Sequence, residues 1–188
     1  HEKQVQVENG IKNALTAVSS DMSDIEKALA LHDWVVRECD YDIENYENNT
    51  IPAESYSYVG VFANGQAVCQ GYAEAMSVLF QKVGIESYVV TSRSMNHAWN
   101  IALLDGEYYH IDATWDDPCP SGNEYEDNID EGYVCHVYFV RSDTEMTTEY
   151  EHFGWSTTGI PACTSENSYK NYIFRYDSEN PVSYTHLR

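Results

Sequence analysis

The sequence predicts an α+β fold in which a helix that begins at a cysteine packs against an antiparallel sheet. Helical spacing of apolar residues dominates the chain up to Gly84, and short runs of β-branched and aromatic residues follow it. The dipeptide Asp105-Gly106 joins two of those runs and is a strong signal for a two-residue hairpin. Helices followed by antiparallel strands are typical of the α+β class.

Three helices are expected before the sheet. Residues 2–18 place apolar side chains at roughly helical spacing. A second helix follows Ser23, which forms a capping-box pattern with Glu26. The third spans 69–84 and ends at a glycine. Because this third helix is apolar on most sides, we expect it to lie buried against the sheet.

Loops and strands are expected between and after these helices. Residues 40–64 are polar and rich in Tyr and Asn, which indicates a long loop with one short helical turn at most. Long loops in compact domains are often functional, and this one leads directly to the third helix. Beyond residue 141 the pattern is mixed. Short strands are expected at 87–91, 97–104, 108–113, 133–140 and 172–176.

The length of 188 residues indicates one domain with a sizeable core. We assign residues 1–182 to this domain, with N-terminal helices at 1–40 and the candidate catalytic residues within 66–118. The tail at 183–188 lacks pattern and receives no role. Hydrophobic residues make up 43% of the chain, which excludes a disordered acidic segment.

The net charge is −21, from 10 basic and 31 acidic residues. This charge repels nucleic acid and anionic lipid, so neither is expected as a partner. No apolar run is long enough to cross a membrane. The chain begins with His1 rather than Met, and a removed signal peptide would fit this start and this charge. We therefore expect a secreted or cell-surface location.

Five cysteines are present, and Cys69 is the candidate nucleophile. The other four allow three disulfide pairings or plain free thiols, and the sequence does not choose among them. These are Cys39, Cys119, Cys135 and Cys163. No cysteine or histidine pair has zinc spacing, so no structural metal is expected. The acidic stretch 116–131 lacks the ligand spacing of a calcium loop, which favours a solvated face over calcium binding.

Cys69 stands at the expected start of the third helix, where a thiol can be activated. Only the thiolate attacks a carbonyl well, and the unpaired N–H groups and partial positive charge of a helix N-terminus stabilise it. The same N–H groups can hold the oxyanion of a tetrahedral intermediate. Gly71 would allow close packing or free access to the sulfur. A lone cysteine is more often a small buried residue, so the interpretation depends on its partners.

His97 and Asp112 are the candidate partners. If the loop at 105–106 has two residues, strand positions that sum to about 211 lie opposite each other. Asp112 is then one diagonal step from His97 on the same face. A carboxylate there fixes the tautomer of the imidazole and stabilises its charged form. Hairpin geometry therefore predicts the His–Asp pair, whereas periodicity cannot place Cys69 against it.

Three segments resemble the motifs of the bacterial transglutaminase-like superfamily, and they come in the same order. They read AVCQGYA at 67–73, NHAWN at 96–100 and DATWDDP at 112–118. The upstream LHDW segment at 31–34 is also similar, so the resemblance covers roughly residues 23–118. It implies a papain/transglutaminase-like fold. Members include protein cross-linking enzymes, cysteine peptidases, peptide:N-glycanase-type amidases and inactive scaffolds.

The resemblance implies that Cys69, His97 and Asp112 form a catalytic triad. We assign supporting positions around that triad to Trp99, Asn100 and Trp115. Structural or surface roles are assigned by default to His110, His136 and His152, and His32 is expected to be a packed or hydrogen-bonded residue of the second helix.

The sequence departs from the animal cross-linking members at two places. Those enzymes carry a tryptophan directly after the nucleophile, where this chain has Gln70. They also carry an oxyanion-stabilising tryptophan upstream, and Trp34, the one upstream tryptophan here, lies in an amphipathic helix and is expected in the core. We expect Tyr58, or else Gln66, to donate to the oxyanion.

These observations predict thiol-dependent acyl transfer on peptide or carboxamide substrates through a thioester at Cys69. Water would resolve the thioester in a cysteine peptidase or amidase, and an amine would resolve it in a transglutaminase. Hydrolysis is slightly favoured, since nothing marks an amine channel. No cofactor is expected, and the partner is a protein or peptide substrate, with cell-wall peptide as one class. The alternatives are a non-catalytic binding or scaffold module of a bacterial surface or secreted protein, and a structural disulfide at Cys69.

Overall fold

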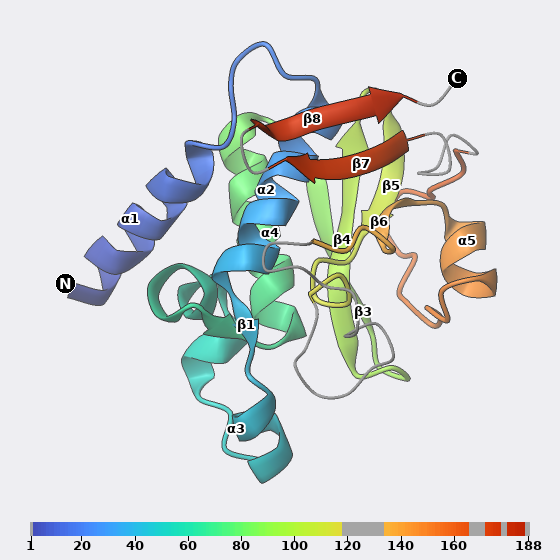
Figure 1. Ribbon diagram of the computed structural model, residues 1–188. Helices are drawn as coiled ribbons and strands as arrows, with labels where there is room; N and C mark the ends of the chain where they lie inside the picture. Colours follow the sequence, from blue (N-terminus) through green and yellow to red (C-terminus); the bar gives the residue numbers. More distant parts are fainter. Residues whose placement is uncertain (1, 118–133, 166–171, 178–179, 187–188) are drawn as a thin grey trace.

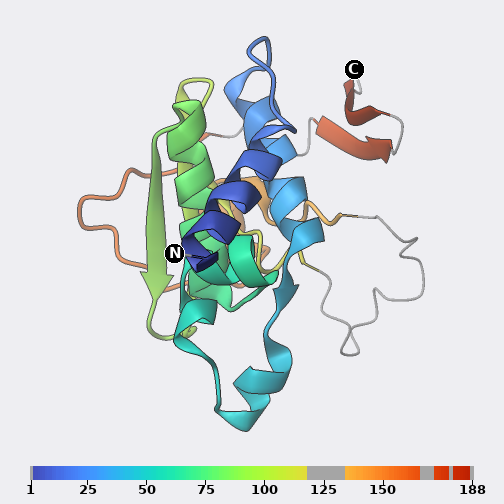
Figure 2. The ribbon, with the colours of Figure 1, turned by 90° about the vertical axis from the view of Figure 1, so that its left-hand side faces the viewer.

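Helices and a four-stranded antiparallel sheet form two layers in the computed structural model (Figure 1). The structure describes residues 2–117, 134–165, 172–177 and 180–186. Figure 2, viewed from the helical side, shows α1, α2 and α4 in front of the sheet. The helices are α1 (Glu2–Leu15), α2 (Asp24–Glu38), α3 (Ile43–Asn48), α4 (Cys69–Val83) and α5 (Asp143–Thr148). The strands are β1 (Asp40–Tyr41), β2 (Gln66–Ala67), β3 (Ser87–Ser92), β4 (His97–Leu104), β5 (Glu107–Ile111), β6 (Phe139–Arg141), β7 (Tyr172–Asp177) and β8 (Asn180–His186).

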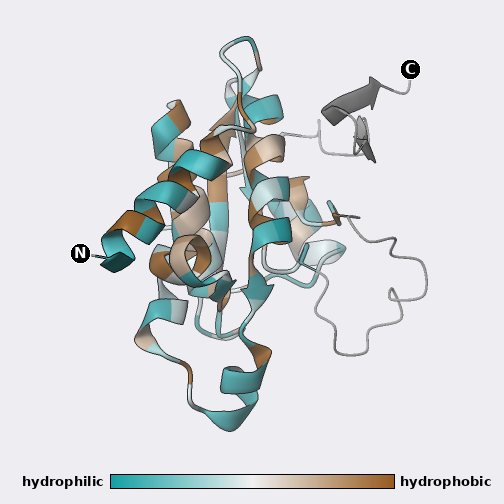
Figure 3. Cartoon of the chain, turned by 60° about the vertical axis from the view of Figure 1, so that its left-hand side comes forward, coloured by the Kyte–Doolittle hydropathy of each residue, from teal (hydrophilic) through white to brown (hydrophobic). Residues whose placement is uncertain are grey.

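The sheet divides two hydrophobic cores. The larger core lies between α1, α2, α4 and one sheet face, which contributes Ala102, Leu104 and Ile111. The smaller core lies on the other face, where Trp99 and Ile101 pack with buried residues near α5. Hydrophobic and hydrophilic residues alternate along α1, as expected for a helix with one side on a core (Figure 3). Successive side chains of a strand point to opposite faces, so along β4 Trp99 and Ile101 lie in the smaller core and Ala102 and Leu104 in the larger one.

The predicted hairpin is confirmed, with its register. Asn100 pairs with Ile111, and the pairing continues to Leu104 opposite Glu107, so paired positions sum to 211 as expected. Asp105 and Gly106 form the turn with φ of 50° and 93°. Two consecutive positive φ values match the twist of the flanking strands and explain the Asp-Gly sequence.

The helix predictions hold, with one shorter end. The Ser23 hydroxyl accepts from the Glu26 N–H and the Glu26 carboxylate accepts from the Ser23 N–H, so the capping box is confirmed. α4 ends at Gly84 as predicted. α1 ends at Leu15 rather than at residue 18. Residues 16–18 each hydrogen-bond to a carbonyl three residues back, which tightens and terminates the helix.

The segment 40–64 is more ordered than the predicted loop. It contains β1, which pairs in parallel with β2, then α3, a 3₁₀ helix (Ala53–Tyr56) and a π-helical turn (Gly60–Asn64). Asp42 organises the segment because its buried carboxylate accepts hydrogen bonds from Asn45 at 2.8 Å and Ser55 at 2.7 Å. The polar composition of the segment does not reveal which of its residues form these hydrogen bonds.

Later elements differ from expectation in three places. The strand predicted at 133–140 begins only at Phe139, because the carbonyls of His136 and Val137 bond to nearby groups, including the guanidinium of Arg141 at 2.6 Å from the latter. α5 was not predicted, although Ser142 and Glu145 form a capping box. β8 includes residues 183–186, which the sequence left without a role. The late strand at 172–176 is confirmed as β7.

The four cysteines that the structure describes carry free thiols, so none of the disulfide pairings among them forms. Cys119 and most of the acidic stretch 116–131, with its calcium question, lie outside the described residues. Within the described chain, every helix is too short or too polar to span a bilayer.

Candidate active site

Cys69 is the first residue of α4, and its side chain is partly exposed. The preceding Val68 caps the helix without a side-chain bond, and its carbonyl accepts from the N–H groups of Gly71 and Tyr72. None of the described hydrogen bonds uses the N–H groups of Cys69 or Gln70. The helix N-terminus therefore presents two free donors and its partial positive charge beside the sulfur.

Gly71 fixes how the start of α4 packs. A Cβ at this position would lie 2.6 Å from the carbonyl oxygen of Ser55 and 2.8 Å from the Cβ of Ala67. Only glycine lets the helix lie this close to the segment before it. Close packing, one of the two roles expected for this glycine, is therefore correct.

His97 and Asp112 form the predicted pair. His97 begins β4 and Asp112 follows β5, and the Nε2 of His97 lies 2.6 Å from Oδ2 of Asp112. Both side chains are buried, with His97 8% and Asp112 0% exposed. The hairpin register brings them together, as the sequence predicted.

All the acceptor positions of Asp112 are used. Oδ1 accepts from the backbone N–H groups of Thr114 at 3.0 Å and Trp115 at 3.2 Å. Oδ2 accepts from His97 and, at 2.9 Å, from Nε2 of His152. Burial alone would raise the pKa of Asp112, but the charges and hydrogen bonds of the two histidines hold it well below its ordinary value. Asp112 is therefore a fixed carboxylate.

The Cys69 side chain interacts with His97 through a hydrogen bond and through its charge. Burial lowers the pKa of His97, but the charge and hydrogen bond of Asp112, with a further hydrogen bond and charge from Cys69, raise it to about 10. Since Asp112 occupies Nε2, the ring nitrogen left for the sulfur is Nδ1. A histidine with this pKa is protonated at neutral pH, which is the partner that a thiolate requires.

Three residues expected to support the triad lie around it. The Trp99 ring stacks on His97 with centroids 5.6 Å apart and an interplanar angle of 22°. The exposed Trp115 ring is tilted against His97, with centroids 5.3 Å apart. Asn100 donates at 2.9 Å to the carbonyl of Ala73 on α4, which ties β4 to the helix that begins at Cys69.

A second chain of hydrogen bonds fixes Trp99. Its indole N–H donates to Nδ1 of His110 at 2.9 Å, so the proton of His110 is on Nε2, which donates to Asp143 at 2.8 Å. His110 and His152 are each 0% exposed and His136 is 7% exposed, so none of the three has the surface role left open by the sequence. His152 in particular touches the triad. No spacing rule could have found it, since it lies 40 residues beyond Asp112.

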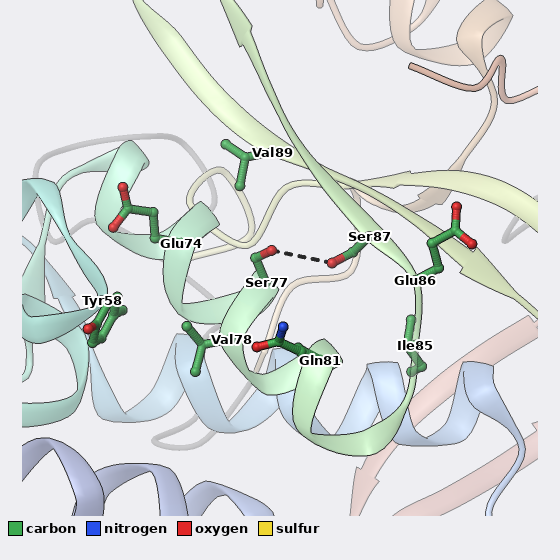
Figure 4. A pocket seen from close by; sticks show the side chains of 9 residues that line it. All are labelled: Tyr58, Glu74, Ser77, Val78, Gln81, Ile85, Glu86, Ser87 and Val89. Carbon is green, nitrogen blue, oxygen red and sulfur yellow. Dashed lines mark hydrogen bonds between the residues drawn. The ribbon is translucent and has the colours of Figure 1, made fainter. Parts of the chain in front are cut away.

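The oxyanion donors remain a prediction. Tyr58 is 38% exposed and packs near Phe62, and Gln66 is exposed on β2. Tyr58 also lines a groove of about 520 Å³ along the outer side of α4 (Figure 4). Figure 4 shows Glu74 at one end of this groove and Glu86 at the other. Glu74 accepts from Gln70, next to the nucleophile, at 3.2 Å.

Three buried clusters bring potential metal ligands within 4.8 Å of one another. They come from distant segments, which local spacing cannot reveal. In each cluster hydrogen bonds of 2.6–3.1 Å already join a histidine nitrogen to a carboxylate. The clusters are His32–Asp33–His136, His97–Asp112–His152 and His110–Asp143–Cys163.

Comparisons with known proteins identify the family of this chain. Residues 11–113 match the model of the transglutaminase-like superfamily. The chain is similar to kyphoscoliosis peptidase from Mus musculus, with 23% identity over 124 residues, and from Homo sapiens, with 22% identity over 123 residues. These matches cover 56% and 55% of this chain and 18% of each relative, so the chain spans less than a fifth of their length.

Two solved structures are similar to this chain. A crystal structure of a TGase superimposes with a TM-score of 0.50 and 16% identity, over 70% of this chain and 36% of that one. A candidate cysteine protease from Cytophaga hutchinsonii gives a TM-score of 0.42 and 19% identity, over 58% of this chain and 38% of that one. The first of these likenesses, with the helices and antiparallel sheet described above, confirms the predicted α+β, transglutaminase-like fold.

Proposed function

Because the chain belongs to the transglutaminase-like superfamily, whose members are typically cysteine proteases or transglutaminases, we propose that it is a thiol-dependent acyl-transfer enzyme. Its substrates are peptides or carboxamides. Cys69 is the nucleophile, His97 the general acid and base, and Asp112 the carboxylate that orients His97. The main support for this proposal is that one imidazole has two partners. His97 makes a 2.6 Å hydrogen bond to Asp112, and it also interacts with the side chain of Cys69.

The first half of the reaction follows from these positions. The Cys69 thiolate attacks the amide carbonyl, and the oxyanion lies at the start of α4, where the N–H groups of Cys69 and Gln70 can donate to it. The C–N bond breaks as His97 gives its proton to the leaving amine. The products of this half are a thioester on Cys69 and a neutral His97.

Water or an amine then resolves the thioester. His97 takes a proton from the incoming water or amine as that group attacks the thioester carbonyl. The C–S bond then breaks, which releases the acid or the new amide and restores the Cys69 thiolate beside a protonated His97. We favour water, hence peptide or amide hydrolysis. Support comes from the curated relatives, which are named as peptidases. The groove along α4 carries Glu74 and Glu86 and is a suitable surface for part of a peptide substrate.

A thiol probe tests the proposal. Iodoacetamide should modify Cys69 quickly below neutral pH in the wild type and at least about 100-fold more slowly in His97→Ala. The same sample contains its own controls. Burial raises the pKa of Cys39 to about 12 and that of Cys163 beyond the ordinary range of a thiol, so both should react slowly throughout.

A substrate library read by mass, with and without a primary amine, tests turnover. We expect Cys69→Ala to abolish turnover, and products in the wild type to show hydrolysis rather than amine incorporation. Equal, slow labelling of Cys69 in the wild type and His97→Ala would contradict the mechanism and favour a non-catalytic binding module.

A further inference from the structure

His152 brings a second histidine to the carboxylate of Asp112. It is 0% exposed, and its Nε2 lies 2.9 Å from Asp112 Oδ2, the same oxygen that His97 contacts. Its other nitrogen, Nδ1, lies 2.8 Å from the carbonyl oxygen of Tyr150. Both ring nitrogens of His152 are therefore engaged, whereas His97 keeps one for the sulfur.

These contacts determine the protons on His152. A carbonyl oxygen only accepts, so Nδ1 carries a proton and donates to Tyr150. Asp112 is an ionised carboxylate and also only accepts, so Nε2 must donate as well. His152 thus meets an acceptor at each ring nitrogen, and its bond to Asp112 Oδ2 is made by an N–H donor.

Aromatic rings hold His152 in place. Trp99 meets it edge-on with centroids 4.9 Å apart, Trp115 lies at 4.4 Å and Tyr138 at 5.3 Å. Packing on these sides leaves the ring one orientation, with Nε2 toward Asp112.

The charged and titratable groups that face His152 come from the strands beneath it. Asp112 contacts it directly, and the His97 ring lies 5.6 Å away, edge-on. His110 is also close, since burial and, less strongly, the charge of His152 lower its pKa. Asp112 is thus the one carboxylate among these groups, and it is shared between two rings.

We propose that His152 is a positioning residue of this site: by donating from both ring nitrogens, it fixes Asp112 Oδ2 in line with Nε2 of His97 and so keeps Nδ1 of His97 turned toward Cys69. The proposal rests on the proposed function, because it assigns His152 a part in the same thiol chemistry. The two backbone amides on Oδ1 hold one end of the carboxylate, and His152 holds the other.

Two substitutions isolate the hydrogen bond that His152 makes to Asp112. His152→Gln keeps an N–H that can reach Asp112, and His152→Phe keeps the ring volume but removes the donor. His32→Gln is the matched control, since His32 is also a 0% exposed histidine between carboxylates, outside the site. Thermal unfolding checks that each variant is folded.

Ring ¹⁵N NMR of histidine-labelled protein gives the direct readout. We expect His97 to show one sharp set of signals in the wild type, His152→Gln and His32→Gln. In His152→Phe the His97 signals should broaden or shift as the ring loses its fixed orientation. Unchanged His97 signals in His152→Phe would overturn the proposal; if the Phe variant does not fold, His152→Ala replaces it.

The rate of Cys69 alkylation by iodoacetamide gives the second readout. It should be at least about tenfold slower in His152→Phe than in the wild type, because His97 no longer keeps Nδ1 turned toward the sulfur, and it should stay within about twofold of the wild type in His152→Gln and His32→Gln. A wild-type rate in His152→Phe would overturn the proposal. If Cys69 is alkylated as fast in His97→Ala as in the wild type, the proposed function is wrong. The NMR signals of His97 in the His152 variants still test whether His152 positions that ring.

Discussion

Two buried histidine clusters differ in how their ring nitrogens are used. In the core cluster, His32 bonds to Asp33 and to Asp116, each at 3.1 Å, and His136 bonds to Asp33 at 2.7 Å. Both nitrogens of His32 are used, and its side chain is 0% exposed. In the active-site cluster His97 uses one nitrogen on Asp112 and keeps the other for Cys69.

The difference shows what separates a histidine held at both ring nitrogens from one that keeps a nitrogen for a thiol. Both rings are charged by neighbouring carboxylates: the pKa of His32 rises to about 9 and that of His97 to about 10, although burial opposes the charge in each. A shifted pKa therefore does not distinguish them. What distinguishes His97 is a free nitrogen that points to a nucleophile at a helix N-terminus.

The largest expected effect comes from exchanging each histidine for alanine. His97→Ala should slow Cys69 alkylation at pH 6 by at least about 100-fold, since it removes the partner of the thiolate. His32→Ala should leave that rate within about twofold but cost on the order of 3–5 kcal/mol of stability, because it leaves buried carboxylates uncompensated. Alkylation kinetics and urea unfolding measure the two effects. A large loss of Cys69 reactivity in a folded His32→Ala would show that the clusters are not independent.

The next effect compares the two carboxylates. Asp112→Asn should lower turnover by about 10²–10⁴-fold and leave a residual rate, because the amide places a donor or a neutral oxygen opposite His97. Asp116→Asn should change turnover little. Burial raises the pKa of Asp116 despite His32, so a neutral amide suits its site, and the amide oxygen can still accept from the Tyr138 N–H. Turnover rates of both variants on the same substrate measure this difference. Equal losses of turnover would contradict the distinction between the two clusters.

The sequence predicted much of the active-site cluster because hairpin geometry is local. The turn at 105–106 sets the register, and the register brings His97 to Asp112. The resemblance of the motif at 67–73 added Cys69. The core cluster and His152 could not be predicted, because they join segments 40 to 103 residues apart through tertiary packing. The capping box at Ser142 was a local signal for α5 that went unused.

The smallest effect is on stability at alkaline pH, and it separates the two clusters on one curve. A histidine whose pKa is raised on folding stabilises the fold below its unfolded value of 6.5, and this contribution is lost as the pH rises through the folded value. The free energy of unfolding should therefore fall from about pH 6.5 to 10 as the two histidines lose their protons. His32→Gln should remove the part of the loss that is complete near pH 9, and His97→Gln the part that continues to about pH 10. Urea unfolding under reducing conditions across this range measures both, and a curve in His32→Gln that still falls as in the wild type would mean that the core cluster is not held together by a charged histidine.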